Sequence, residues 1–252
     1  MLLNIDANPK TIKGQRRGYM TAVLYLSPAD SSNVQLCPVS NVAGCVASCL
    51  NTAGRGGMAA GNATFIAPNG QALPDNTVQR ARLRRTEWFN TDQAGFMAAL
   101  CDEIRAFVRK AKLRRLVPVV RLNGTSDIRW ESVACGEHAN VFAAFPRVQF
   151  YDYTKIPNRR VSGIPNYHLT FSYSHRSEYA PIVAKALTHY SDAVSFSVVF
   201  RGAMPAYFLG RPVINGDESD LRFLDQPGVV VGLTAKGRAK RDTSGFVVRV
   251  AA

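Results

Sequence analysis

The sequence predicts an α/β protein built as a partial or irregular (β/α) barrel with mostly parallel strands. Three observations support this fold class. Short apolar runs recur along the chain, helical or polar segments separate them, and several runs are apolar on both faces, as in Val229-Val230-Val231. Strands that are apolar on both faces suit a parallel sheet covered on both sides. Strands that alternate with helices indicate an α/β barrel or an open wound sheet.

Seven short segments rich in β-branched or aromatic residues are predicted as strands. They cover residues 21–26, 116–122, 147–153, 167–173, 193–200, 212–214 and 229–233. The clearest predicted helix covers residues 92–112, because Asp92 suits an N-cap and apolar side chains recur at helical spacing. Cys101 lies beside this apolar stripe and is expected to be a small core residue. Further helices are expected at residues 130–143, 179–189 and 203–209.

The chain of 252 residues is long enough for one large domain. We expect a single α/β domain over residues 1–252, with a cysteine-bearing loop at about residues 28–58. No apolar run approaches the length of a membrane span, and residues 1–17 lack the apolar centre of a secretory signal. A cytoplasmic, reducing location is therefore expected, where cysteines do not generally pair as disulfides.

The charge of the chain is strongly positive, with 31 lysines and arginines against 18 aspartates and glutamates, a net charge of +13. Such an excess favours an anionic partner, a nucleic acid or a nucleotide, with a solvated basic surface as the simpler alternative. On a helix, Arg80 and Arg84 would share a face that suits phosphate groups, because they are four residues apart. The basic run at residues 236–241 either binds nucleic acid or is solvated.

Three cysteines, Cys37, Cys45 and Cys49, follow the first predicted strand closely. Clustered thiols in an intracellular chain are more often metal ligands than disulfide partners, and three ligands leave one metal position open. Zinc sites usually show two close cysteine pairs, whereas only Cys45 and Cys49 form such a pair here. The spacing therefore favours an iron–sulfur cluster, with zinc or no metal as alternatives. Cys135 or a histidine is the candidate for a fourth ligand.

Polar residues follow the other predicted strands, and the carboxyl ends of parallel strands carry the chemistry of α/β folds. The second strand is followed by Asn123, Thr125 and Asp127, whose side-chain oxygens suit an amino group. The alternative is an Asx or Ser/Thr turn that caps the next helix. The ends of the third, fourth and fifth strands add Lys155, Ser172, Ser174 and Arg201.

Three blocks of sequence identify a resemblance to a known family. They are GCVASCLNTAGRG at residues 44–56, VRLNGTSDI at residues 120–128, and GDE with DLR at residues 216–222. Together they resemble an uncharacterised bacteriophage family, the gene-product-eighty-eight family, over nearly the whole chain. This resemblance implies a phage or prophage origin and, since that family has no settled activity, no particular reaction.

The place of the cysteine loop also resembles that in radical S-adenosylmethionine enzymes, where such a loop follows the first strand of a partial barrel. The cysteines of those enzymes are more closely spaced. The resemblance implies a 4Fe–4S cluster held by Cys37, Cys45 and Cys49, with S-adenosylmethionine bound at the fourth iron. Residues implied to orient this cofactor or contact its ribose and carboxylate are Asn123, Thr125, Asp127, Ser172, Ser174 and Arg201. Residues expected to hold an anionic substrate are Arg80, Arg84 and Lys155.

Two other functions remain open at this point. One is a non-enzymatic nucleic-acid-binding protein of phage replication, with a structural metal or none, which the basic excess motivates. The other is a metal-dependent nuclease that uses Asp217, Glu218 and Asp127, because clustered carboxylates serve phosphoryl chemistry. Ser219 and Asp220 are instead expected to cap a helix. Whether the protein is an enzyme is left open.

Overall fold

The computed structural model describes residues 1–6, 8–190 and 194–250. The strands of its main sheet are β1 (Leu3–Ile5), β2 (Tyr19–Leu24), β5 (Val117–Arg121), β6 (Gln149–Thr154), β7 (Tyr167–Ser172), β8 (Phe196–Arg201), β9 (Tyr207–Phe208), β10 (Arg211–Asn215), β11 (Val230–Thr234) and β12 (Val248–Arg249). A separate hairpin consists of β3 (Thr64–Ile66) and β4 (Ala72–Pro74).

The α-helices are α1 (Pro9–Gln15), α2 (Thr77–Thr91), α3 (Gln93–Leu113), α4 (Val141–Ala144) and α5 (Ala180–Tyr190). The 3₁₀ turns used below are η1 (Leu50–Thr52), η2 (Gly54–Gly57), η4 (Trp130–Ser132), η6 (Arg222–Leu224) and η7 (Gly237–Arg241). No helix in the described ranges combines the length and the apolar character that crossing a membrane requires.

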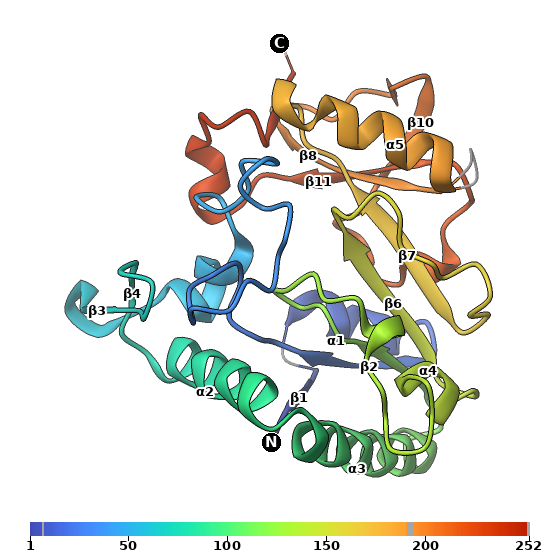
Figure 1. Ribbon diagram of the computed structural model, residues 1–252. Coiled ribbons are helices and arrows are strands. Elements are labelled where there is room, and N and C mark those ends of the chain that lie inside the picture. The colour runs from blue at the N-terminus through green and yellow to red at the C-terminus, as the bar shows by residue number, and fades with distance from the viewer. Residues whose placement is uncertain (7, 191–193, 251–252) are drawn as a thin grey trace.

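The main sheet has the order β1-β2-β5-β6-β7-β8-β11-β10-β9, with β12 beside β8. Strands β2, β5, β6, β7, β8 and β11 are neighbours in sequence order and all pair in parallel. The predicted fold class is confirmed: this is an α/β protein with a large, mostly parallel mixed sheet. From β2 to β8 the strand order follows the sequence, and beyond β8 it reverses, because β11 lies between β8 and β10. Figure 1 shows the strands following one another in an arc, from β2 through β6 and β7 to β8 and β11.

One face of the sheet is covered by helices and holds the apolar core. Ala22, Val120 and Phe150 on β2, β5 and β6 pack with the apolar sides of α2 and α3 in one buried cluster. Phe171 and Phe196 on β7 and β8 pack with α5 in a second cluster. Right-handed crossovers between successive parallel strands place their helices on the same face, which accounts for this arrangement.

The opposite face of the sheet is polar near its centre. Arg121 on β5 and both Tyr151 and Tyr153 on β6 donate hydrogen bonds to the carboxylate of Asp220, at 3.3, 2.9 and 3.3 Å. Asp220 precedes η6 and is buried. The expected helix N-cap at Asp220 is therefore wrong, because its carboxylate binds side chains of the sheet instead.

Each predicted strand has a counterpart in the structure, with ends shifted by a few residues, and residues 191–193 lie outside the described residues. The helices predicted at residues 92–112 and 179–189 are confirmed as α3 and α5. Asp92 caps α3 as predicted, since its Oδ1 accepts a hydrogen bond from Gly95 N at 2.9 Å.

Two helix predictions are wrong. Residues 130–143 form only η4 and the short α4, because Gly136 adopts a left-handed φ of 59° and Asn140 starts a new helix by accepting from Ala143 N at 3.0 Å. Residues 203–209 contain β9, which pairs with β10, after Gly202 turns the chain at a φ of 105°. The elements β1, α1, β3, β4, α2 and β12 had no counterpart among the predictions.

Cys101 is a buried core residue, as predicted, but its pairing with another cysteine was not expected. Cys101 on α3 and Cys135 form a disulfide within the apolar core, with their Cα atoms 7.7 Å apart. The expectation that the cysteines stay unpaired is wrong for this pair, because the packing of α3 brings the two side chains together. Cys135 is therefore not a fourth ligand for the cysteine-bearing loop.

Candidate functional site

The cysteine-bearing segment, residues 28–58, lies inside the arc of strands (Figure 1). Three hydrogen bonds attach it to residues that follow the parallel strands. Leu36 O accepts from Asp127 N at 2.9 Å, and Ala43 O accepts from Ser174 Oγ at 2.7 Å. Gly44 O accepts from the Oγ of Ser244, which follows η7, at 2.7 Å. The segment is therefore seated on the carboxyl ends of the sheet, where the sequence places it.

Cys37, Cys45 and Cys49 are unpaired, and each is half-buried. The Sγ of Cys37 accepts from Ala29 N at 3.3 Å, and the Sγ of Cys49 accepts from Asn51 N at 3.4 Å. The charges of Cys45 and Cys49 act on Cys37, and the charge of Cys45 acts on Cys49, so the three thiols lie within electrostatic range of one another.

The protein environment holds these thiols in their neutral form. Burial is the largest influence on the pKa of each of the three thiols and raises it, to about 11 for Cys49. The N–H groups of Ala29 and Asn51 act in the opposite direction on Cys37 and Cys49. Because the thiolate is the form that binds a metal, metal binding here would release protons.

The donor atoms fit a thiolate-bound centre in kind, since one short segment offers three free cysteines. In the described part of the chain, however, no three His, Cys, Asp or Glu side chains already stand in a metal-binding arrangement. The three sulfurs would have to come closer together to share one metal centre.

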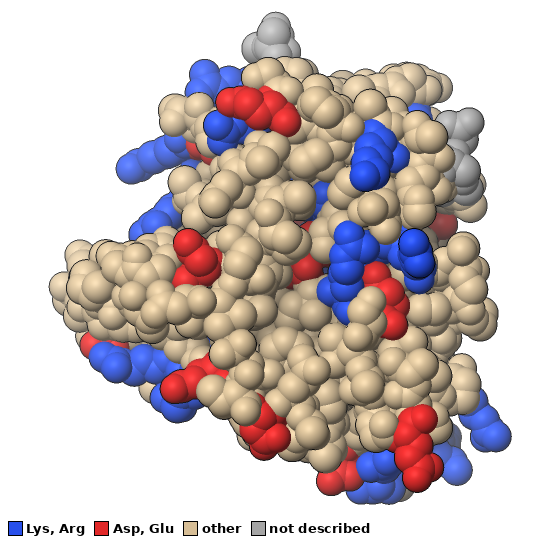
Figure 2. Space-filling model, in the orientation of Figure 1, with Lys and Arg blue, Asp and Glu red and all other residues tan. Residues whose placement is uncertain are grey.

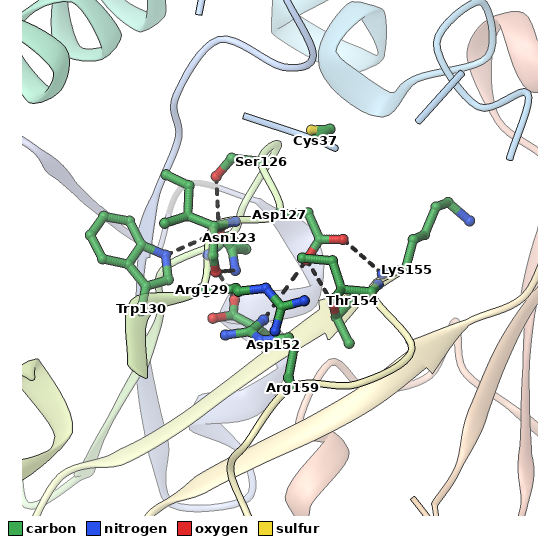
Figure 3. Close-up of polar contacts among 12 residues, drawn as sticks. Cys37, Asn123, Ser126, Asp127, Arg129, Trp130, Asp152, Thr154, Lys155 and Arg159 are labelled. Atoms are coloured by element: carbon green, nitrogen blue, oxygen red, sulfur yellow. Dashed lines mark hydrogen bonds and ion pairs between the residues drawn. The ribbon is translucent and has the colours of Figure 1, made fainter. Parts of the chain in front are cut away.

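Lys155, directly after β6, brings a positive charge to the three loop cysteines. Its Nζ donates to Ser172 Oγ at 3.0 Å and to Ser172 O at 3.2 Å. Asp127 fixes the base of this residue by accepting from Lys155 N and from Thr154 Oγ1, each at 2.7 Å (Figure 3). Burial lowers the pKa of the Lys155 ammonium, while the nearby loop cysteines and Asp127 raise it. Lys155 is thus a cation whose charge could balance that of thiolates at the three loop cysteines.

Asn123 and Thr125 hold the turn after β5. The Oδ1 of Asn123 accepts from Ser126 Oγ, Ile128 N and Trp130 Nε1, each at 3.0 Å (Figure 3). The hydroxyl of Thr125 donates to a carbonyl oxygen just after β2, at 2.5 Å. The side-chain oxygens of Asn123 and Thr125 therefore form hydrogen bonds within the protein, as expected if these residues stabilise a turn.

The remaining predicted cofactor residues divide into two groups. Ser172 and Ser174 both lie at the cysteine-bearing segment, Ser172 through Lys155 and Ser174 through its bond to Ala43. Arg201 is at the end of β8 and donates to Lys240 O at 3.0 Å, so it contacts the basic run instead.

Of the predicted substrate residues, only Lys155 faces the cysteines. Arg80 on α2 is exposed, pairs with Asp75 at 2.7 Å and lies 4.7 Å from the centre of the Phe65 ring. Arg84 is also exposed on α2. The structure therefore places these arginines on the outside of α2.

The carboxylates of the nuclease hypothesis are engaged separately. Asp217 forms ion pairs with Lys10 at 3.0 Å and with Lys236 at 2.8 Å. Asp127 binds Thr154 and the backbone of Lys155, as described above. These contacts leave no shared carboxylate cluster in the described residues.

Several buried charges were not singled out from the sequence. Arg159 pairs with Glu131 and lies 3.8 Å from the Asp127 carboxylate. Arg82 on α2 points inward and binds Asn51 of the cysteine-bearing segment. The buried residues of α2 are Gln79, Arg82, Thr86 and Phe89, which recur at helical spacing. This spacing is the one sequence pattern that could have indicated an inward-facing Arg82. Only Phe89 among these four residues is apolar, so the pattern does not indicate a buried helical face from the sequence alone.

The fold and this site define a class: an α/β protein with a mostly parallel sheet whose thiol-bearing segment lies across the carboxyl ends of its strands. Over residues 2–250 the chain matches the gene product 88 family, and it belongs to that family. No curated protein and no solved structure matches the chain. The predicted family is thus confirmed, and the likeness to radical S-adenosylmethionine enzymes stays a proposal.

Proposed function

We propose that this member of the gene product 88 family is an iron–sulfur protein that works in the manner of radical S-adenosylmethionine enzymes. One observation carries the proposal: three free cysteines share a segment seated on the carboxyl ends of consecutive parallel strands. This is where α/β folds place their chemistry.

Cys37, Cys45 and Cys49 are the residues that would hold a 4Fe–4S cluster. Such a cluster, with one iron free of protein ligands, supplies one-electron chemistry to a bound S-adenosylmethionine. The chain's own part is to keep the thiols out of bulk water and to provide nearby positive charge. Lys155 supplies that charge, and Asp127 and Ser172 hold the lysine in place.

The aromatic surroundings support this role for Lys155. Its Nζ lies 4.5 Å from the centre of the Phe246 ring and 5.4 Å from that of Tyr179. A cation over aromatic faces in a partly dry site is stabilised without a second carboxylate. Its charge therefore remains available to an anion, either the thiolates or a phosphate-bearing substrate.

Anaerobic reconstitution with iron and sulfide tests the proposal. We expect visible-region iron–sulfur absorbance and about three to four irons per chain, the content of a cluster held by three thiolates. The Cys45→Ala variant should lose most of this absorbance. A double variant, Cys101→Ala with Cys135→Ala, removes cysteines outside the segment and should keep it.

Two outcomes would reject the iron–sulfur proposal. One is a wild-type protein without cluster absorbance, including a protein that retains only zinc. The other is absorbance that Cys45→Ala leaves unchanged.

A second candidate function, nucleic-acid binding, rests on the surface beside the same segment. Arg238, Lys240 and Arg241 of η7 and Arg55 of η2 are exposed, and none of these four described residues is in an ion pair. Residues of η1 contact η7, so the four cations belong to neighbouring turns. Figure 2 shows lysine and arginine side chains on the surface at upper left, where η7 lies in Figure 1.

This second candidate predicts that the protein binds single-stranded DNA or RNA at low salt through phosphate contacts. Fluorescence anisotropy with labelled oligonucleotides measures this. Absence of binding at low salt would remove the candidate and leave the iron–sulfur proposal standing.

A further inference from the structure

Arg82 is a buried cation without an acidic partner. Its residue is 7% exposed, and its guanidinium interacts with Tyr25, Cys49 and Arg85 but with no aspartate or glutamate of the described residues. Its Nε is buried and has no hydrogen-bond partner. Two other buried arginines contrast with it, since Arg121 pairs with Asp220 and Arg159 with Glu131.

Burial of an uncompensated charge is unfavourable, so most buried charges are paired or hold a ligand. The Tyr25 ring, whose centre lies 5.1 Å from the Arg82 guanidinium carbon, offsets part of this cost. Among the described residues, Arg82 reaches the sulfur of Cys49 through Asn51, which binds the guanidinium and donates to that sulfur. The position therefore suits an anionic group held at Cys49.

A chain of hydrogen bonds joins Arg82 to that sulfur. The Nη1 of Arg82 donates to Asn51 O at 2.7 Å and to Asn51 Oδ1 at 2.5 Å. The backbone N–H of the same asparagine donates to the Sγ of Cys49 at 3.4 Å. Arg82 thus orients the residue that donates to the cysteine.

Gln79 and Gly56 fix this arrangement. Gln79 accepts from Asn51 Nδ2 at 3.0 Å and donates to Asn51 O at 2.8 Å and to Gly56 O at 2.7 Å. A Cβ at Gly56 would lie 2.4 Å from Asn51 O and 3.0 Å from the Arg82 Nη1. Two helical residues and a glycine therefore hold one asparagine in a single orientation.

We propose that Arg82 is a positioning residue for the centre held at Cys49, acting through the Asn51 N–H and through its own uncompensated charge. This inference rests on the proposed iron–sulfur function. Hydrogen bonds and positive charge near a cluster sulfur stabilise the more negative, reduced state and raise the reduction potential. Removal of the Arg82 charge should therefore lower that potential.

The test compares three variants of the full chain after anaerobic reconstitution. The midpoint potential is measured by redox titration without substrate, and cluster loss is followed after addition of an iron chelator. We expect Arg82→Gln to shift the potential to more negative values and to speed cluster loss about tenfold or more, the range typical for loss of an outer-shell partner. Arg82→Lys keeps the charge and should retain most of the wild-type potential.

Arg84→Gln is the matched control, because Arg84 is on the same helix but exposed. It should leave the potential and the rate of cluster loss at their wild-type values. Circular dichroism of each variant checks that the helices are intact.

The outcomes separate this inference from the proposed function. A wild-type protein that holds no cluster overturns both. A wild-type protein with a cluster whose potential is the same in Arg82→Gln and Arg84→Gln overturns the role of Arg82 alone. A potential in Arg82→Lys equal to that in Arg82→Gln also overturns it, since a purely structural contact would not follow the charge.

Discussion

Asp152 is the clearest case of a residue whose surroundings change its chemistry. Its side chain is fully buried, its Oδ1 accepts from Asn123 N at 2.7 Å, and its Oδ2 accepts from Tyr167 at 3.1 Å. Burial raises the pKa of this carboxyl to about 7, although Arg121 and Arg159 act against the rise. A neutral, protonated carboxyl therefore fits the core near pH 6, while the same group in an unfolded chain is ionised.

Asp152 should make the protein less stable as the pH rises from about 4 to 7. Within this window the folded chain keeps the proton and the unfolded chain does not, so each pH unit lowers the free energy of unfolding by about 1.4 kcal/mol. Asp152→Asn removes this dependence. Urea denaturation of both proteins across the window measures it, and parallel pH profiles of wild type and variant would contradict the assignment.

Gly56 should tolerate no side chain, because its Cβ position lies 2.4 Å from Asn51 O. We expect Gly56→Ala to lower the free energy of unfolding by about 1–3 kcal/mol through overpacking. Gly163→Ala is the control, since that position opens to free space. Chemical denaturation compares the two, and equal stability of the two variants would argue against a close-packed contact between Gly56 and Asn51 O.

Part of the candidate site was predicted from the sequence. The three cysteines, Lys155 and Ser172 were named from their places at strand ends, and the structure brings them to one region. Arg80 and Arg84 were chosen from the sequence because residues four apart share a helical face, and Arg82 was not singled out. Only the packing of α2 against the cysteine-bearing segment decides which of them turns inward.

At the scale of elements, the cysteine-bearing segment has little regular structure and depends on its neighbours. Beyond the contacts to Asp127 and Ser174, it is held by the turn after β11. Asp242 Oδ1 accepts from Ser48 Oγ at 2.6 Å and from Ser244 Oγ at 2.7 Å, and Ser244 binds Gly44. One carboxylate thus joins two segments that lie far apart in sequence.

Replacement of Asp242 by alanine should loosen this junction without unfolding the protein. We expect hydrogen exchange in residues 40–50 and 242–248 to speed up about tenfold or more, which corresponds to a local loss of about 1.4 kcal/mol. Exchange in α3 serves as the internal reference and should not change. Unchanged exchange in residues 40–50 would mean that the strand-end contacts alone hold the segment.

Elements that are specified by their own local sequence were predicted correctly, and elements that depend on distant contacts were not. Strands such as β11 and the helix α3 were recovered because their apolar patterns are continuous and α3 has a side-chain cap. Residues 130–143 failed because Gly136 and Asn140 interrupt an otherwise helical pattern. The short strands β1 and β12 exist only through pairing with β2 and β8, and no local pattern marks such edge pairing.

At the scale of the whole molecule, the excess of positive charge is not evenly compensated. The run at η7 carries exposed cations without acidic partners in the described residues, whereas Arg80 and Arg105 have such partners. Net charge governs association with anionic partners more than it governs the fold. The η7 surface is therefore the part of the molecule at which phosphate contacts are expected.

Binding of single-stranded nucleic acid, if phosphate-driven, should depend on η7. The triple variant Arg238→Ala, Lys240→Ala, Arg241→Ala should reduce the slope of log K against log salt by about 2 to 3. A triple variant on α3, with Arg109, Lys110 and Arg105 changed to alanine, has the same loss of charge and should change the slope little. Anisotropy titrations at several salt concentrations measure both, and equal losses would indicate net charge alone.

The attachment of the cysteine-bearing segment to Ser244 has a consequence for biosynthesis. Ser244 is 200 residues beyond the glycine that it binds. During translation the cysteines are therefore made well before Ser244, and the seat that shields them is completed only once Ser244 has left the ribosome. Until then this contact cannot shield the sulfurs from oxidants or stray metal ions, so in air the nascent chain needs protection as well as the finished one.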